Sequence, residues 1–319
     1  MKPPSRISAI LQAVFVTFLW STSWVFIKLG LRGDLPPITF AGLRYMIAFL
    51  CLVPVVIWNP GHRAALRRIT GREWLQLTLL GIVFYSLAQG AQYVSLAYLP
   101  AVVVNLLLNL CPVLVGIIAI FTLRESPTPL QWVGIGLATL GTGLFFLPFT
   151  LPSAAWIGLA VAVLAMAANS VGTLQGRHAN RDLSLSPVLI TSISMGIGAS
   201  LMLASGLIFE GLGKPTGLDW GYIIWMAVVN TAFAFTLWNH TMRTLTAIES
   251  SILNSLMMPQ IAVLAVIFLG EELTIKEIVA LVLVGLGVLA VQLKGTARQK
   301  EKVATAIPLE TGHDDLSGD

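Results

Sequence analysis

The strongest constraint on the fold is an internal repeat of apolar segments. Residues 97–141 read AYLPAVVVNLLLNLCPVLVGIIAIFTLRESPTPLQWVGIGLATLG, and residues 244–287 read TLTAIESSILNSLMMPQIAVLAVIFLGEELTIKEIVALVLVGLG. Each copy has an apolar segment with a proline, Pro112 or Pro259, then a polar break with a glutamate, then a second apolar segment that ends in glycine. A repeat of this length determines the architecture, so we expect two structurally similar halves.

The composition places this repeat in a lipid bilayer. Of 319 residues, 56% are hydrophobic and only 11% are charged, whereas soluble domains carry about 25% charged residues. So few charges cannot cover a surface that faces water. Ten apolar segments are long enough to cross about 30 Å of hydrocarbon. They cover residues 8–31, 36–58, 74–97, 101–123, 129–149, 154–176, 186–209, 219–242, 247–269 and 274–294. Continuous apolar runs predict transmembrane helices, because barrel strands would alternate in hydrophobicity.

Lysine and arginine residues indicate how the chain is oriented in the membrane. With the N-terminus inside, cytoplasmic segments carry 14 of these residues and outer segments carry 4, so both termini are predicted to be cytoplasmic. Each repeat holds five spans, in residues 8–149 and 154–294. Because five is odd, equivalent helices cross in opposite directions, which predicts two inverted five-helix repeats with a central site between them. Residues 295–319 are mostly polar and predict a disordered cytoplasmic tail.

Polar side chains within the spans are the candidates for that central site. Gln89, Gln92 and Tyr93 share one helix face, and the repeat pairs Gln92 with Asn239 and Tyr93 with His240. For each such residue, an interhelical hydrogen bond is the more common role and cavity lining the less common one. The set as a whole favours a cavity lined by spans one, three, four, six, eight and nine. The candidate substrate-binding residues are Trp20, Ser23, Trp24, Arg44, Gln89, Gln92, Tyr93, Asn105, Asn109, Asn169, Thr173, Trp238, Asn239, His240, Ser251 and Asn254.

Three residues in or near spans carry charge or titrate. Arg44 lies about 10 Å into the second span, where a charge costs roughly 2.5–3.5 kcal/mol on insertion scales. It is equally well interpreted as a partner of helix-end carbonyls and as a counter-charge for an anionic ligand group. Glu249 and His240 are candidates for proton coupling, although an interfacial position is the more common role for each. Pro112 and Pro259 remove a backbone donor in mid-span and predict kinks.

The sequence contains little that suggests catalysis or a bound cofactor. Cys51 and Cys111 lie in apolar runs and are expected to behave as small apolar side chains. No metal-ligand motif, nucleophile elbow or phosphate loop is present, so we expect no cofactor, no metal ion and no enzymatic activity. The expected partners are a small-molecule substrate and the lipid bilayer, with a homodimer left open. No nucleic-acid partner is expected.

Four segments resemble the EamA family of the drug/metabolite transporter superfamily. They are LWSTSWVFIKLGL, ITFAGLRYMIAF with Arg44, AQYVSLAYLPAVVVNLLLNLCPVLVGIIAIFTLRE, and FAFTLWNHTMRTLTAIESSILNSLMMPQIAVLAVIFLGEELT. The resemblance covers the chain except its tail. It implies a ten-helix transporter with inverted five-helix repeats that moves small metabolites, often amino acids, or exports toxic compounds. The first repeat departs from the family in having Arg124–Glu125 where Gly–Glu is usual.

These observations predict a secondary transporter of a small metabolite, with efflux as one direction, that works by alternating access as a multi-pass protein of the cell (inner) membrane. Two alternatives remain open. A membrane-embedded enzyme acting on a lipid-linked substrate would need a cluster of acids, histidines or a nucleophile at one membrane face. A non-transporting channel or sensor is the other alternative, and the sensor is disfavoured because the chain has no long soluble segment.

Overall fold

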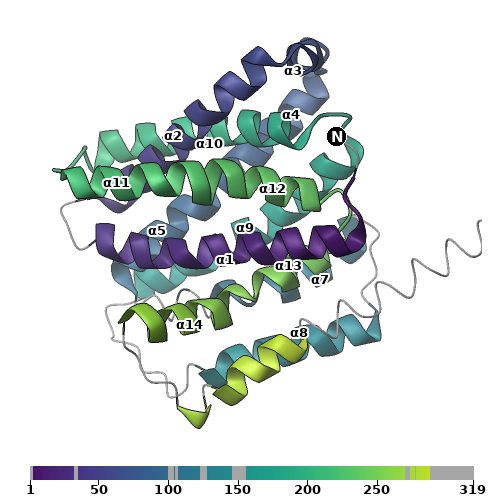
Figure 1. Ribbon diagram of the computed structural model, residues 1–319, viewed down its shortest axis with the longest axis vertical. Coiled ribbons are helices and arrows are strands. Elements are labelled where there is room, and N and C mark those ends of the chain that lie inside the picture. The colour runs from purple at the N-terminus through teal and green to yellow at the C-terminus, as the bar shows by residue number, and fades with distance from the viewer. Residues whose placement is uncertain are drawn as a thin grey trace, which may run out of the picture.

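The structure, a computed structural model, describes residues 3–31, 35–99, 104, 107–122, 128–145, 156–269, 274–276 and 278–287. All regular structure in these residues is helical, and long helices lie side by side in a bundle (Figure 1). The elements are α1 (Arg6–Gly30), α2 (Pro37–Trp58), α3 (Pro60–Leu66), α4 (Gly71–Leu80), η1 (Gly81–Ala88), α5 (Gln89–Tyr98), α7 (Cys111–Thr122), α8 (Pro129–Phe145), α9 (Trp156–Asp182), α10 (Pro187–Phe209), α11 (Gly217–Trp225), η3 (Met226–Phe233), α12 (Ala234–Thr241), α13 (Ala247–Asn254) and α14 (Met257–Leu269). A further apolar helix covers Ile278–Gly287.

Among the described residues, six helices are long and apolar enough to cross a membrane. They are α1, α2, α9, α10 and two continuous helices, α4–η1–α5 and α11–η3–α12. The predicted all-helical class is thus confirmed. Of the other four predicted spans, 101–123, 129–149 and 274–294 are described only in part, by α7, by α8 and by helix 278–287. The span 247–269 is described as two shorter helices, α13 and α14.

The two continuous helices share a construction that the sequence analysis did not predict. Each begins with a capping box, formed by Thr70 with Glu73 and by Thr216 with Asp219, which satisfies backbone donors at the helix start. Each then passes through an eight-residue π-helical segment, η1 or η3. Segments of this kind are rare and often lie at functional sites. The π-helical segments pack against corresponding neighbours, η1 against α10 and η3 against α2.

Both helices with a repeated proline are interrupted just before it. A turn at residues 109–110 precedes α7, in which Pro112 is the second residue, and a turn at residues 255–256 separates α13 from α14, in which Pro259 is the third. At these turns, backbone bonds join residues three apart, as in Leu110 N–H to the Leu107 carbonyl at 3.0 Å. Proline has no N–H with which to continue the α-helical pattern, so the interruption lies where the pattern loses a donor.

Close helix crossings occur in reciprocal pairs. A Cβ atom at Gly141 of α8 would lie 2.6 Å from the Ala280 carbonyl oxygen, and one at Gly287 would lie 2.6 Å from the Gly134 carbonyl oxygen. Residues 134 and 280, like 141 and 287, are 146 positions apart. The same contact is therefore made twice with the two helices exchanged, and these helices lie together at one edge of the bundle (Figure 1).

Helices α2 and α10 cross in the same reciprocal way. A Cβ atom at Gly42 would lie 2.6 Å from the Leu203 Cα, and one at Gly196 would lie 2.6 Å from the Phe49 ring. Positions 42 and 196 are 154 residues apart, as are positions 49 and 203. Small residues at such crossings let membrane helices approach closely. This crossing brings a helix of the first half of the chain against a helix of the second half.

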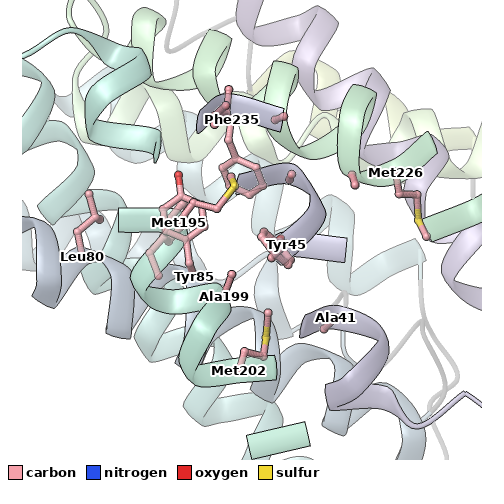
Figure 2. Packing of buried hydrophobic residues seen from close by; sticks show 14 of the residues in the cluster. Ala41, Tyr45, Leu80, Tyr85, Met195, Ala199, Met202, Met226 and Phe235 are labelled. Atoms are coloured by element: carbon pink, nitrogen blue, oxygen red, sulfur yellow. The ribbon is translucent and has the colours of Figure 1, made fainter. Parts of the chain in front are cut away.

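The largest buried apolar cluster surrounds this crossing. Figure 2 shows Tyr45 of α2, Tyr85 of η1 and Phe235 of α12 gathered beside Met195 and Met202 of α10. The Tyr85 and Phe235 ring centroids are 5.1 Å apart, and those of Tyr45 and Tyr85 are 6.2 Å apart in an edge-to-face arrangement. Such aromatic pairs add to the stabilisation from burial alone. Tyr45, Phe84 and Phe235 of this cluster also line the central cavity.

Candidate functional site

A cavity lies between the two halves, beside the second half of α1 and near the middle of α9. The space between its lining atoms, which includes the part open to solvent, is about 950 Å³. Its lining comes from α1, α2, η1, α5, the turn before α7, α7, α9, α12, α13, the turn after α13 and α14. The lining residues are Trp20, Ser23, Trp24, Ile27, Arg44, Tyr45, Phe84, Gln89, Gln92, Tyr93, Leu108, Asn109, Cys111, Asn169, Thr173, Phe235, Trp238, Ser251, Asn254, Ser255 and Met257.

Most of the predicted site residues meet in this cavity. Those that line it are Trp20, Ser23, Trp24, Arg44, Gln89, Gln92, Tyr93, Asn109, Asn169, Thr173, Trp238, Ser251 and Asn254. Of the remaining three, Asn105 lies outside the described residues, and Asn239 and His240 face other neighbours. The lining residues come from spans far apart in the sequence, so the amides that share single helix faces converge on one space. Their role in substrate binding stays a prediction.

Arg44 is the charged group of the described cavity wall, and it is only 4% exposed. Its Nε donates to Thr231 Oγ1 at 2.7 Å, Nη1 donates to the Tyr93 hydroxyl at 3.1 Å, and Nη2 contacts Ser23 Oγ at 3.3 Å and the Asn230 carbonyl at 3.5 Å. Thr231 and Asn230 belong to η3. All of these partners are neutral. The guanidinium is therefore held in a defined orientation without a compensating negative charge among its hydrogen-bond partners.

Next to Arg44, hydrogen bonds join α1 to η3. The Asn230 side-chain amide donates to the Leu19 carbonyl at 2.6 Å and to Ser23 Oγ at 2.8 Å. The Asn230 carbonyl also accepts from Trp20 Nε1 at 3.0 Å. A π-helical segment changes the hydrogen-bond register of its backbone, and here a carbonyl of that segment accepts bonds from two side chains that line the cavity.

Aromatic rings form much of the remaining wall. The Trp20 ring centroid lies 4.8 Å from that of Phe235 and 5.0 Å from that of Trp238. Phe84 packs edge-on against Phe235 at 5.9 Å. Between these rings, half-buried amides of Gln89, Gln92, Asn169 and Asn254 reach the cavity. An apolar wall with a few converging polar groups is typical of a binding site for a small organic molecule.

Asn239 and His240 do not line the cavity, because a helix turns by about 100° per residue and, of these three consecutive residues, only Trp238 faces it. The Asn239 side chain accepts from Asn180 Nδ2 at 2.7 Å and donates to Thr191 Oγ1 at 2.7 Å. This network joins α9, α10 and α12 behind the aromatic wall. His240 Nδ1 lies 3.2 Å from Gln12 Oε1 on α1.

Glu249 also lies away from the cavity, at the start of α13. It is 2% exposed, and its Oε1 accepts from Arg6 Nη2 at 2.5 Å. Its Oε2 accepts from the Thr246 N–H at 2.9 Å in a capping box. The pair joins the beginnings of α1 and α13. Proton coupling by Glu249 stays untested, and in this structure its carboxylate is an ion-pair and capping group.

Further polar contacts close the same end of the bundle, where α1 begins. Arg177 of α9 donates to the Met242 carbonyl, Arg243 donates to the Leu185 carbonyl, and Thr244 Oγ1 donates to the Pro4 carbonyl at 2.9 Å. We call these contacts, together with the pair of Arg6 and Glu249, the N-terminal closure. They link α9, α12, α13 and the N-terminal segment between the cavity and this end.

The model of the EamA-like transporter family matches residues 7–147 and 156–293. The chain belongs to the EamA-like transporter family. Its family and its long apolar helices identify a multi-pass membrane transporter, which confirms the predicted family.

This EamA-like transporter is similar to proteins from Bacillus subtilis and Archaeoglobus fulgidus. The uncharacterized transporter YoaV of Bacillus subtilis (strain 168) is 25% identical over 299 residues, which cover 88% of this chain and 96% of YoaV. An uncharacterized transporter of Archaeoglobus fulgidus is 28% identical over 283 residues, which cover 88% of this chain and 96% of that protein. One solved crystal structure has a TM-score of 0.73 at 19% identity and covers 93% of this chain and 100% of that one. It has the same fold.

Sequence reasoning missed part of the transporter's cavity wall. The apolar lining residues were not predicted, because their type does not distinguish a cavity from lipid or core. They are Ile27, Tyr45, Phe84, Leu108, Cys111, Phe235 and Met257. Ser255 was missed as well, although it directly follows Asn254 at the interrupted helix. Asn230 and Thr231 were missed as partners of Arg44 because only the tertiary fold brings η3 to α2. Among the described residues, no cluster of acids, histidines and cysteines could hold a metal ion.

Proposed function

We propose that this EamA-like transporter moves a small metabolite across the membrane by alternating access, with the central cavity as its substrate site. One observation carries this proposal. Polar side chains from six predicted spans converge on one cavity that also adjoins both interrupted helices, through Asn109 and Cys111 on one side and Asn254 and Ser255 on the other. Discontinuous helices at a midplane site between repeats are the usual construction of secondary transporters.

The proposal includes two five-helix repeats of opposite orientation, with both termini in the cytoplasm. The reciprocal crossings of α8 with helix 278–287 and of α2 with α10 support a pseudo-two-fold relation between the halves. The matching neighbours of η1 and η3 support it too. The bias of lysine and arginine toward one side supports the orientation. The N-terminal closure would then be the cytoplasmic gate, closed in this structure.

The other function classes have less support. The family and its named relatives are transporters. Among the described lining residues, Arg44 is the only charged one, and neither an acid nor a histidine accompanies it. General acid–base catalysis on a lipid-linked substrate most often uses a histidine or a carboxylate within hydrogen-bond reach.

Counterflow into proteoliposomes tests the proposal. Vesicles loaded with one metabolite of a panel take up the same labelled metabolite if the protein exchanges it. We expect Gln92→Ala to reduce this uptake and Gln76→Ala to leave it unchanged. Gln76 is a matched control because it is half-buried and contacts His178 at 3.3 Å, outside the cavity. Absence of exchange for every solute of the panel would reject the proposal, and equal uptake by both variants would reject the cavity as the site.

A further inference from the structure

The charge of the cavity restricts what it can hold. An arginine side chain is always protonated in proteins, so Arg44 gives the described wall one positive charge. A guanidinium has five N–H donors, and the four hydrogen bonds of Arg44 use at most four of them. At least one N–H of Nη1 remains to donate to a ligand. The Tyr45 ring, 5.5 Å from the guanidinium carbon, adds a cation–π contact but no negative charge.

No described carboxylate is placed to neutralise this charge, because each has a partner at a helix end. Glu73 and Asp219 close capping boxes at the starts of α4 and α11. Asp182 pairs with Arg181, and Glu249 pairs with Arg6. Glu210 accepts from the backbone N–H groups of residues 38 and 39. A buried cation without a counter-ion is costly, so a bound anion would stabilise the site.

The lining residues other than Arg44 indicate what kind of body the anion has. The rings of Trp20, Trp24, Phe84, Phe235 and Trp238 offer a wall for an aromatic or branched apolar group. Amides of the other lining residues can accept and donate hydrogen bonds, but they carry no charge. The described wall therefore has no negative charge to pair with an ammonium group, and it has one cation for an acid.

We propose that the cavity binds a monocarboxylate with an aromatic or branched apolar body, and that its carboxylate pairs with Arg44. The inference rests on the proposed function and specifies its substrate class. The apolar body would lie against the rings around Trp20. Zwitterions would bind more weakly because their ammonium group would lose water without gaining a counter-charge, and cations would be repelled by Arg44.

Matched ligands test this class in calorimetric titrations of the purified full-length protein. Phenylacetate, indole-3-acetate and 4-methylpentanoate are each compared with the amine and the alcohol of the same body, and phenylacetate is also compared with phenylalanine. We expect the tightest acid to bind roughly 10- to 100-fold more tightly than its alcohol, the usual range for a charge-assisted hydrogen bond. If no acid binds more tightly than its amine and its alcohol, the inference is wrong.

Substitutions connect this preference to Arg44. Arg44→Gln should remove the preference for the acid and leave the affinity for the alcohol within about twofold. If Arg44→Gln does not fold, Gln92→Glu replaces it, because this variant keeps Arg44 and adds a negative charge to the wall. Gln92→Glu should weaken acid binding and strengthen amine binding, whereas Gln76→Glu, outside the cavity, should change neither. An unchanged preference in Gln92→Glu or Arg44→Gln would overturn the inference.

Counterflow with the same compounds separates failure of the inference from failure of the proposed function. Exchange of the acids, but not of the amines, supports both. Exchange of amines, alcohols or other uncharged metabolites in preference to the acids keeps the transport function and rejects the substrate class. No exchange of any solute, while the acids still bind, would reject transport and leave a binding site for carboxylates.

Discussion

Substitution of Glu249 by glutamine is expected to open the N-terminal closure. Glu249 connects α13 to α1 through Arg6, and the two side chains are only 3% and 13% exposed. Glutamine is nearly the same size and keeps an oxygen to accept from the Thr246 N–H, so the start of α13 should stay capped. The variant therefore removes mainly the attraction between the carboxylate and the Arg6 guanidinium.

The magnitude follows from how deeply the pair is buried. Solvent screens such a pair poorly, and removal of one partner of a buried ion pair typically costs about 3–5 kcal/mol. Under the proposed mechanism, the pair forms only while this end of the bundle is closed. If about 1.5 kcal/mol of the loss is specific to the closed state, the population of the open state rises roughly tenfold.

Cys111 provides a reporter of this opening. The chain has two cysteines, and Cys51 is exposed whereas Cys111 is buried and lines the cavity. In a Cys51→Ser background, a membrane-impermeant thiol reagent is added to vesicles from the side of the N-terminal closure. Labelling of Cys111 should become about tenfold faster in Glu249→Gln and in Arg6→Gln.

A nearby ion pair supplies the matched control. Asp182 and Arg181 form a pair at the end of α9, and their side chains are 36% and 38% exposed. Exposed pairs contribute little to stability, so Asp182→Asn should leave labelling unchanged. If Glu249→Gln and Arg6→Gln are folded by size-exclusion chromatography but label at the parent rate, the closure does not gate the cavity. An equal increase in Asp182→Asn would show that the effect is not specific.

Three further substitutions test the framework around the cavity. Asn239→Ala should lower the free energy of unfolding in detergent by about 1–3 kcal/mol, because the buried Asn180 amide loses one of its two acceptors; an unchanged value would contradict the network. Gly141→Ala should destabilise by about 1–3 kcal/mol because its Cβ would overlap the facing helix, whereas Gly136→Ala, with open space around it, should not in the same unfolding experiment. Pro259→Ala restores a backbone donor and should slow counterflow by making α13 and α14 more continuous; an unchanged rate would show that the interruption is not needed for transport.

The helical membrane class and most of the candidate site could be predicted from local patterns. Ten apolar runs, one internal repeat and the one-face spacing of Gln89, Gln92 and Tyr93 depend only on the order of residues. Pro112 and Pro259 were expected to kink their helices, and turns lie a few residues before each of them. These features could be predicted because the bilayer forces the backbone into helices, so helical periodicity alone determines which residues share a face.

The repeat was a less reliable guide at single positions. It pairs Gln92 with Asn239 and Tyr93 with His240, yet Gln92 and Tyr93 line the cavity while Asn239 and His240 bond elsewhere. The reason is that the cavity lies asymmetrically across the two halves. Span eight presents Trp238 to it, and the neighbouring positions turn toward α10 and α1.

The order of residues was sufficient to predict a helical transporter built from a repeated unit, because membrane insertion and helix periodicity are local properties. Contacts between distant segments were needed to show which groups surround Arg44. Two of its partners, Thr231 and Asn230, lie nearly 190 positions away in a π-helical segment that no sequence pattern predicted. Whether a buried charge is neutralised depends on which groups the packed helices bring within hydrogen-bond distance, and that depends on the tertiary structure.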